Sequence, residues 1–440
     1  MAKKKQEMTP EERLAAALVP GEEQPYQLPE GWKWVYLGKI TTIVGGGTPS
    51  SSHPEYYDGG EVPWITPADL SNYHEVYISR GKKNITEQGL AKSSTKLMPP
   101  NTVLLSSRAP IGYVAIAEND ICTNQGFKSF LPSVHFEPRY LYWFFKGNQT
   151  LLTQYASGTT FLELSARRAG EIKFPIAPIS EQQRLVARIE SLFAKLDAAK
   201  EKVQSVFDAH EMRKAALLHD AFAGKLTAKW RTEQGISFDV WRVEKLENLC
   251  EKITCGKTPK NDISSQGEIP YLKVYNIVND EIDFLSKPQY IPRYVHDTKL
   301  KSSILKPNDV IMNIVGPPLR KIAIIPDTYR EWNMNQAIVR FRPKDGLNYR
   351  FLYYALLNPE TLDDVIQKTK GVVGQANISI TQSRNLKIKL PSLSEQQEIV
   401  RILDRLLGRE EQVRQSAESV LETIDRMKQS ILARAFRGEL

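Results

Sequence analysis

The chain has 440 residues, of which 41% are hydrophobic and 25% are charged, and its formal net charge is +8. This length and composition predict a globular protein of two or three domains. No apolar run reaches the roughly eighteen residues of a transmembrane helix. The three scattered cysteines exclude a disulfide framework and a four-ligand zinc site. The basic charge is compatible with a polyanionic partner but does not establish one.

The N-terminal arm, residues 1–31, begins Met1-Ala2-Lys3-Lys4-Lys5 and continues as a polar sequence. A secretory signal would carry an apolar core at this place, so we expect a cytoplasmic protein. The segment from Met8 to Leu18 suits a short helix.

A first globule is predicted over residues 32–175. Residues 102–105 and 113–116 are short runs of β-forming residues around a turn that contains Pro110 and Gly112. Residues 138–152 suit a short helix. A long polar loop covers residues 45–52, and loops of this kind often carry function on a rigid scaffold.

A long helix is predicted within residues 176–230. No proline interrupts the chain from Ser180 to about Ala223. Ser180 and Gln183 have the spacing of a capping box, and Gly224 stands where a left-handed terminal residue belongs. Apolar residues recur at steps of four and three, which is a heptad seam. The predicted seam consists of Leu185, Ile189, Leu192, Leu196, Ala199, Val203, Val206 and Leu217.

The rest of the chain repeats this unit, with a globule over residues 231–391 and a helix over residues 392–440. The segments that start at Ser180 and Ser394 share about 14 of 47 residues without a gap, at an offset of 214. Both begin Ser-Glu-Gln-Gln and end Ala-Phe-x-Gly-x-Leu. The second helix ends at Gly438, and its predicted seam consists of Ile399, Leu403, Leu406, Val413, Ala417, Val420, Ile424, Met427 and Ile431.

The two globules share short motifs in the same order. These are Gly46–Pro49 with Gly256–Pro259, Val62–Ile65 with Ile269–Leu272, Pro100–Val103 with Pro307–Val310, Asn124-Gln125 with Asn335-Gln336, and Tyr140–Trp143 with Phe351–Tyr354. The predicted fold is therefore α+β, with two repeated globules that alternate with two long helices. A helix of about 44 residues, roughly 66 Å, cannot bury a narrow seam inside one globule, so we expect the two helices to form an antiparallel coiled coil. His210 and Glu410 fall on the seams and are interpreted as polar breaks that fix the pairing.

Both globules are net basic. Residues 32–174 hold 14 basic and 11 acidic side chains, and residues 241–391 hold 23 and 16. This charge alone is weak evidence for a nucleic-acid partner.

Motifs that would indicate catalysis are missing from the sequence. It has no phosphate-binding Gly-x-x-x-x-Gly-Lys-Ser/Thr loop and no His-Glu-x-x-His metal motif. Neither Met98–Asn101 nor Gly316–Leu319 matches the Asn/Asp-Pro-Pro-aromatic motif of amino-methyltransferases. Cys122 is better interpreted as a small buried hydrophobic residue than as a nucleophile. The sequence therefore predicts a protein that binds and does not catalyse, with no metal or cofactor of its own.

The doubled motifs resemble the DNA-specificity subunits of type I restriction–modification systems, over nearly all of residues 26–440. The resemblance implies that each globule is a target recognition domain, which reads one half of a bipartite, asymmetric site on double-stranded DNA. It also implies that the coiled coil sets the spacing of the half-sites. The implied partners are two modification subunits, which methylate adenine N6 with S-adenosylmethionine, and two restriction subunits that use ATP and Mg. No membrane partner is expected.

Candidate DNA-contacting residues are polar or basic side chains in the loops of both globules. Arg108 and Arg320 lie in proline-flanked turns and could address guanine. Asn124, Gln125, Asn335 and Gln336 recur in both copies, which also fits a role in the shared scaffold. The full set is Thr48, Ser50, Ser51, Lys82, Lys83, Arg108, Asn124, Gln125, Lys257, Lys260, Asn261, Arg320, Lys321, Asn335 and Gln336.

The matched helix ends offer two interpretations. Phe222, Leu226, Phe436 and Leu440 could dock the modification subunits, or they could pack on the adjacent globule. For the whole chain, the alternatives to DNA recognition are a coiled-coil adaptor whose globules bind proteins and a DNA enzyme with an unrecognised active site.

Overall fold

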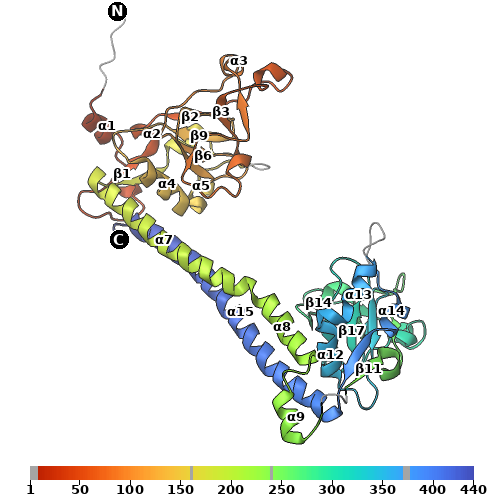
Figure 1. The fold of residues 1–440 in the computed structure, drawn as a ribbon. Coiled ribbons are helices and arrows are strands. Elements are labelled where there is room, and N and C mark those ends of the chain that lie inside the picture. Colours follow the sequence, from red (N-terminus) through yellow and green to blue (C-terminus); the bar gives the residue numbers. More distant parts are fainter. Residues whose placement is uncertain (1–7, 159–161, 238–240, 370–376) are drawn as a thin grey trace, which may run out of the picture. The chain divides into compact units, whose positions relative to one another are not determined.

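The computed structural model describes residues 8–158, 162–237, 241–369 and 377–440; the lysines near the N-terminus lie outside this range. The chain divides into two compact units, Met1–Val203 with Val420–Leu440 and Gln204–Ser419. Each unit combines strands and short helices with parts of the long helices, as the α+β prediction required (Figure 1).

The first unit contains sheets in the strand orders β1-β10, β2-β9-β6-β7-β4 and β5-β3-β8. Its strands are β1 (Lys33–Tyr36), β2 (Ile43–Gly45), β3 (Val62–Ile65), β4 (Tyr77–Ile78), β5 (Lys83–Ile85), β6 (Val103–Ser106), β7 (Val114–Ala117), β8 (Cys122–Thr123), β9 (Phe127–Phe130) and β10 (Lys173–Ile176). Its short helices are α1 (Pro10–Ala16), α2 (Leu37–Ile40), α3 (Glu87–Ala91), α4 (Pro138–Gly147), α5 (Gln149–Gln154) and α6 (Ala166–Gly170).

The second unit contains sheets in the orders β11-β21, β12-β20-β17-β18, β16-β13-β19 and β14-β15. Its strands are β11 (Arg242–Lys245), β12 (Thr254–Cys255), β13 (Ile269–Leu272), β14 (Ile277–Val278), β15 (Glu281–Ile282), β16 (Tyr290–Ile291), β17 (Val310–Asn313), β18 (Ile322–Ile324), β19 (Asn333–Met334), β20 (Ile338–Phe341) and β21 (Lys387–Leu390). Its short helices are α9 (Ala228–Gln234), α10 (Leu246–Leu249), α11 (Arg293–Asp297), α12 (Tyr349–Leu357), α13 (Pro359–Thr369) and α14 (Ile380–Arg384).

The two units repeat the same topology. The order β2-β9-β6-β7 corresponds to β12-β20-β17-β18, and β5-β3-β8 corresponds to β16-β13-β19. Each three-stranded sheet has the same parallel pair, in which Trp64 lies opposite Cys122 and Tyr271 lies opposite Asn333. The predicted strands at 102–105 and 113–116 are present as β6 and β7, one residue later than expected, and the predicted helix over 138–152 is divided into α4 and α5.

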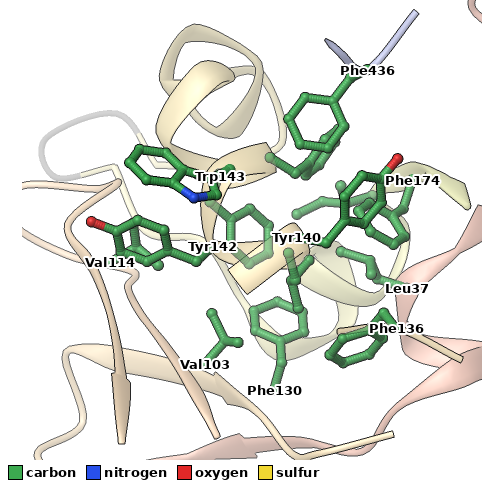
Figure 2. Close-up of a cluster of buried hydrophobic side chains, with 14 of the residues drawn as sticks. Leu37, Val103, Val114, Phe130, Phe136, Tyr140, Tyr142, Trp143, Phe174 and Phe436 are labelled. Carbon is green, nitrogen blue, oxygen red and sulfur yellow. The ribbon is translucent and has the colours of Figure 1, made fainter. Parts of the chain in front are cut away.

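The core of the first unit forms around α4, whose residues Tyr140 to Phe145 are all buried (Figure 2). The ring of Tyr140 lies 5.5 Å from that of Phe174 and 4.9 Å from that of Phe436, between ring centroids. Because Phe436 comes from the end of the last helix, this cluster joins that helix to the sheet. Aromatic side chains bury large areas, and such clusters dominate core energetics.

The long helices are α7 (Ile179–Asp208), α8 (His210–Phe222) and α15 (Leu393–Ala435). In the first unit Asp197 pairs with Lys428, and Lys200 pairs with Asp425 at 2.8 Å. In the second unit Arg213 pairs with Glu410 at 2.6 Å. Residue numbers rise along one helix as they fall along the other, so the predicted antiparallel pairing is confirmed.

The predicted seam was wrong at several positions. Ala199 and Val206 are exposed, and the half-buried positions are Lys200 and Phe207. On α15, Val413, Val420 and Met427 are between 42% and 47% exposed. The inward positions there are Arg414, Leu421 and Lys428. Long basic side chains can bury their aliphatic stems while the charged head stays in water, and the Lys428 ammonium lies 5.0 Å from the centroid of the Phe193 ring.

The predicted boundaries of the helices also need correction. The first helix is interrupted at Ala209, where the Arg213 guanidinium donates to the carbonyl of Val206 at 3.1 Å and so enters the backbone ladder. The helices begin at Ile179 and Leu393, one residue before the serines predicted as caps. Gly224 and Gly438 adopt the predicted left-handed conformation, with φ of 75° and 73°.

We expect the buried His296 to make the stability of the second unit dependent on pH. Burial lowers its pKa, although the carboxylate of Glu331 opposes the shift, and its Nδ1 accepts a hydrogen bond from Asn333 at 3.0 Å. As the pH falls below about 6.5, the side chain of His296 becomes protonated in the unfolded chain but stays neutral in the folded protein. We therefore expect the free energy of unfolding to fall by up to about 1.4 kcal/mol per pH unit.

Urea unfolding of wild type and His296→Gln between pH 7.5 and 5 measures this effect. The variant should show a shallower loss of stability towards acid. Identical slopes for the two proteins would contradict the assignment.

Candidate nucleic-acid interface

The Gly-x-Thr-Pro loop is attached to the sheet in the same way in both units. The indole Nε1 of Trp64 on β3 donates to the carbonyl of Gly47 at 2.9 Å. The hydroxyl of Tyr271 on β13 donates to the carbonyl of Lys257 at 2.8 Å. The aromatic residue of the Val/Ile-Pro-aromatic motif therefore holds the loop that opens each globule, which explains why the two motifs occur together.

Glycine is required at the start of these loops because the backbone passes very close to its neighbour. A Cβ atom on Gly46 would overlap the carbonyl oxygen of Asn124, and one on Gly256 would overlap that of Met334. This close approach brings the Gly-x-Thr-Pro loop against the Asn-Gln motif in both units.

The recurrent Asn-Gln pairs contribute to this scaffold. Thr48 donates to Gln125, and Thr258 donates to Gln336 in the second unit. In each pair the asparagine accepts a hydrogen bond from the backbone two residues later, Asn124 from Gly126 at 2.9 Å and Asn335 from Ala337 at 3.2 Å. The contacts of these four predicted residues fit the scaffold role. A direct role at DNA stays a prediction for them.

Other candidates are exposed in or beside the loops. Lys82 and Lys83 precede or begin β5, and the backbone N–H of Lys82 donates to Asp69 at 2.9 Å. The Ser50 hydroxyl lies 2.7 Å from that of Ser52. Thr48, Gln125 and Gln336 are also exposed, and the other exposed candidates are Ser50, Ser51, Lys82, Lys83, Lys257, Lys260 and Asn261. Their side chains are accessible to a phosphate backbone.

The two candidate arginines lie in equivalent turns, Arg108 between β6 and β7 and Arg320 between β17 and β18. Arg108 forms an ion pair with Glu163 at 3.1 Å, and Arg320 forms one with Asp363. Neighbouring Lys321 donates to the carbonyl of Ile277 at 2.9 Å. The acidic partners were not found from the sequence, because each lies more than forty residues away along the chain.

At the helix ends, Phe222 and Phe436 are 5% and 3% exposed and belong to the cores of their units. The Phe222 ring lies 5.3 Å from that of Phe351. Leu226 and Leu440 are partly buried against the same cores. These positions correspond to packing on the adjacent globule, which was one of the two predicted alternatives.

The Ser-Glu-Gln-Gln motif joins each long helix to its globule through its first glutamine. Gln182 donates to the carbonyls of His135 and Ala177, and its side-chain oxygen accepts from the backbone N–H of Glu137 at 2.9 Å. Gln396 makes the same three contacts, with Gly346, Pro391 and the backbone N–H of Asn348. The sequence repeat signalled this motif, but the interpretation as a capping box gave the role to the wrong residues.

Two of the three cysteines, Cys122 and Cys250, are buried and fit an inert role. Burial raises the pKa of Cys122 to about 12 and that of Cys250 to about 12, so both thiols stay protonated. Within the described ranges, no cluster of three or more histidine, cysteine or acidic residues could hold a metal ion. Among the helices that the structure describes, none has the length and apolar character needed to cross a membrane.

Comparison with known proteins places the chain beside one family. The model of the type I restriction modification DNA specificity domain matches residues 29–206 and 239–419. The MjaIX specificity subunit of Methanocaldococcus jannaschii is 29% identical over 357 residues, which cover 78% of this chain and 80% of that protein. The EcoKI specificity subunit of Escherichia coli K12 is 23% identical over 443 residues, which cover 94% and 90%.

Solved structures show the same fold. The HsdS subunit from Thermoanaerobacter tengcongensis superposes with a TM-score of 0.59 at 19% identity, over 95% of this chain and all of that one. A structure from work on complex assembly and conformational transition of the type I R-M system superposes with a TM-score of 0.75 at 20% identity, over 94% of this chain.

Proposed function

Because the chain belongs to the DNA specificity subunits of type I restriction–modification systems, we propose that its two recognition domains each read one half of a bipartite, asymmetric site on double-stranded DNA. The specificity subunit is the non-catalytic component of such a system. The observation that carries the proposal is the repeated topology with divergent loops, since two similar scaffolds with different loops can read two different sequences.

Affinity and sequence choice would come from different side chains. The exposed lysines would contact phosphates, which gives affinity that falls with salt. Arg108 and Arg320, in equivalent turns of the two domains, would contact base edges, and a bidentate arginine prefers the O6 and N7 atoms of guanine. The partners are two modification subunits that carry S-adenosylmethionine and methylate adenine N6, and two restriction subunits that carry ATP and Mg. This chain would direct their activities to the site.

The proposal is tested by co-expressing the chain with the modification subunit of the same system and mapping methylated adenines in the host genome. Methylation of one defined bipartite sequence is the expected result. Assembly without methylation of any defined site would overturn the proposal and favour a protein-binding adaptor. Methyl transfer by the isolated chain would instead indicate an enzyme.

The roles of the two arginines are tested separately in the assembled complex. Arg320→Ala should weaken binding to the cognate site by about 1–3 kcal/mol and relax the sequence requirement in one half-site only. Arg108→Ala is the matched control and should relax the other half. Filter binding to duplexes with substitutions in either half measures both effects, and a uniform loss across both halves would show general phosphate binding.

A further inference from the structure

Both candidate base-reading arginines form an ion pair with a carboxylate of their own domain. Arg108 and Arg320 occupy equivalent turns, and each is bound by an acidic side chain from the part of the domain that follows α4 or α12. Neither the arginines nor the acids stand at equivalent positions in the repeat, because Arg108 comes two residues after β6 whereas Arg320 comes two residues before β18. Asp363 lies on α13, whereas Glu163 lies beyond α5 and before α6. Both turns thus contain an arginine–carboxylate pair, although the paired residues come from different positions of the repeat.

In the second domain the ion pair involves, among the described residues, only one arginine and one carboxylate. The side chains of Arg320 and Asp363 are 39% and 44% exposed, so a DNA duplex can reach the guanidinium only in competition with the carboxylate. In the first domain Glu163 also accepts from Lys128 at 3.4 Å, and the lysine side chain is only 10% exposed. Glu163 therefore neutralises one exposed and one nearly buried cation.

The fold itself gains little from the exposed pairs. An exposed ion pair contributes little to stability, because solvent screens the attraction and two long side chains lose freedom. A carboxylate beside a DNA-binding arginine has a larger consequence for binding, since it opposes the approach of any phosphate and competes with DNA for the N–H groups of the guanidinium.

We propose that Glu163 and Asp363 are specificity-determining residues, which keep Arg108 and Arg320 from binding DNA that lacks the matching base. This inference rests on the proposed DNA-reading function. Breaking the ion pair and bringing the freed carboxylate towards the duplex costs free energy, and a single phosphate contact recovers little of it. A bidentate contact to guanine forms two charge-assisted hydrogen bonds and recovers more of this free energy. The acids thus penalise non-cognate DNA more than cognate DNA.

Asp363→Asn in the assembled complex is the direct test. Fluorescence anisotropy measures affinity for the duplex identified by methylation mapping and for a scrambled duplex of the same length, at several salt concentrations. We expect the scrambled duplex to bind about two- to five-fold more tightly, the factor that corresponds to one exposed ion pair. The slope of log affinity against log salt should steepen by about 0.9 for that duplex. Cognate affinity should rise less, so the specificity ratio falls.

Asp364→Asn is the matched control. Asp364 is the next residue on α13, is exposed, and its substitution changes the net charge by the same amount. Equal effects of the two substitutions would show a general charge effect and overturn the proposal, as would an unchanged specificity ratio in Asp363→Asn. Glu163→Gln should act on the other half-site, and the double variant should combine the two effects additively.

These outcomes separate the inference from the function on which it rests. If the wild-type complex methylates no bipartite site, the proposed function fails. If it methylates a defined site but Asp363→Asn discriminates as well as wild type, only the role of the acids fails. An unfolding midpoint for each variant close to that of wild type would confirm that the binding changes do not come from loss of structure.

Discussion

Glu395→Ala should destabilise the second unit by about 3–5 kcal/mol, because it removes the carboxylate from a buried ion pair. Glu395 is fully buried and accepts hydrogen bonds from Arg231 at 2.6 Å, from Thr227 at 2.7 Å and from Trp241 at 2.8 Å. These contacts join the start of α15 to α9 and to the residue before β11. Hydrogen exchange of peptides from α12 and α15, with urea unfolding of the full chain, measures the loss.

The repeat provides a matched control in Glu181, the same motif position in the first unit. Its side chain is 30% exposed and pairs with Arg184 at 2.7 Å within one helical turn. Glu181→Ala should therefore cost less than about 1 kcal/mol. Losses of similar size at the two positions would show that the motif position itself, and not burial, sets the contribution of the carboxylate.

Phe436→Ala should destabilise the first unit by about 3–5 kcal/mol, the usual cost of removing a buried aromatic side chain. Phe436 packs against Tyr140 and Phe144, at 4.9 and 5.4 Å between ring centroids (Figure 2). It also lies where the chain ends its last helix, so the cavity would loosen the contact of α15 with the sheet. Thermal and urea unfolding of the full chain measure the effect.

The same variant separates the two interpretations of the helix ends. A packing residue loses stability when truncated, and Phe436→Leu should recover most of that loss because it keeps much of the buried volume. If Phe436 were instead a docking anchor, the Phe436→Ala protein would keep its stability but would no longer co-purify with the modification subunits. Met427→Ala is the control on the same helix, since its side chain is 47% exposed and its truncation should change stability by no more than about 0.5 kcal/mol.

The internal repeat separates contacts of the shared scaffold from contacts that belong to one copy only. Corresponding residues make corresponding contacts in the two units. Gln182 and Gln396 do so at the start of the long helices, and Trp64 and Tyr271 do so where they donate to the Gly-x-Thr-Pro loops. A contact that appears twice with different neighbours reflects the shared scaffold. A contact whose partner differs between the copies, such as Glu163 in one and Asp363 in the other, is a candidate for what distinguishes the two readers.

The order of globules and helices, the antiparallel pairing and the glycines that end the long helices were all predicted correctly from the amino-acid sequence. These features follow from signals that lie within a few residues of each other: heptad spacing, proline-free runs, and glycine at a left-handed position. Because the globule-and-helix unit occurs twice in the chain, each of these sequence signals is present in two copies. The seam was misassigned because strict steps of four and three lead to Ala199 and Val206, whereas the adjacent Lys200 and Phe207 are the half-buried residues.

The contacts between side chains that are distant in the sequence could not be predicted and depend on how the chain folds. Whether Lys428 buries its stem depends on the facing ring of Phe193, and whether Glu395 is buried depends on α9 and Trp241. The partners of Arg108 and Arg320 are likewise fixed by how α13 and the segment before α6 pack against the turns. Contacts of this kind leave no periodic trace in a sequence, because they depend on chain segments brought together by the fold and not on spacing along the chain.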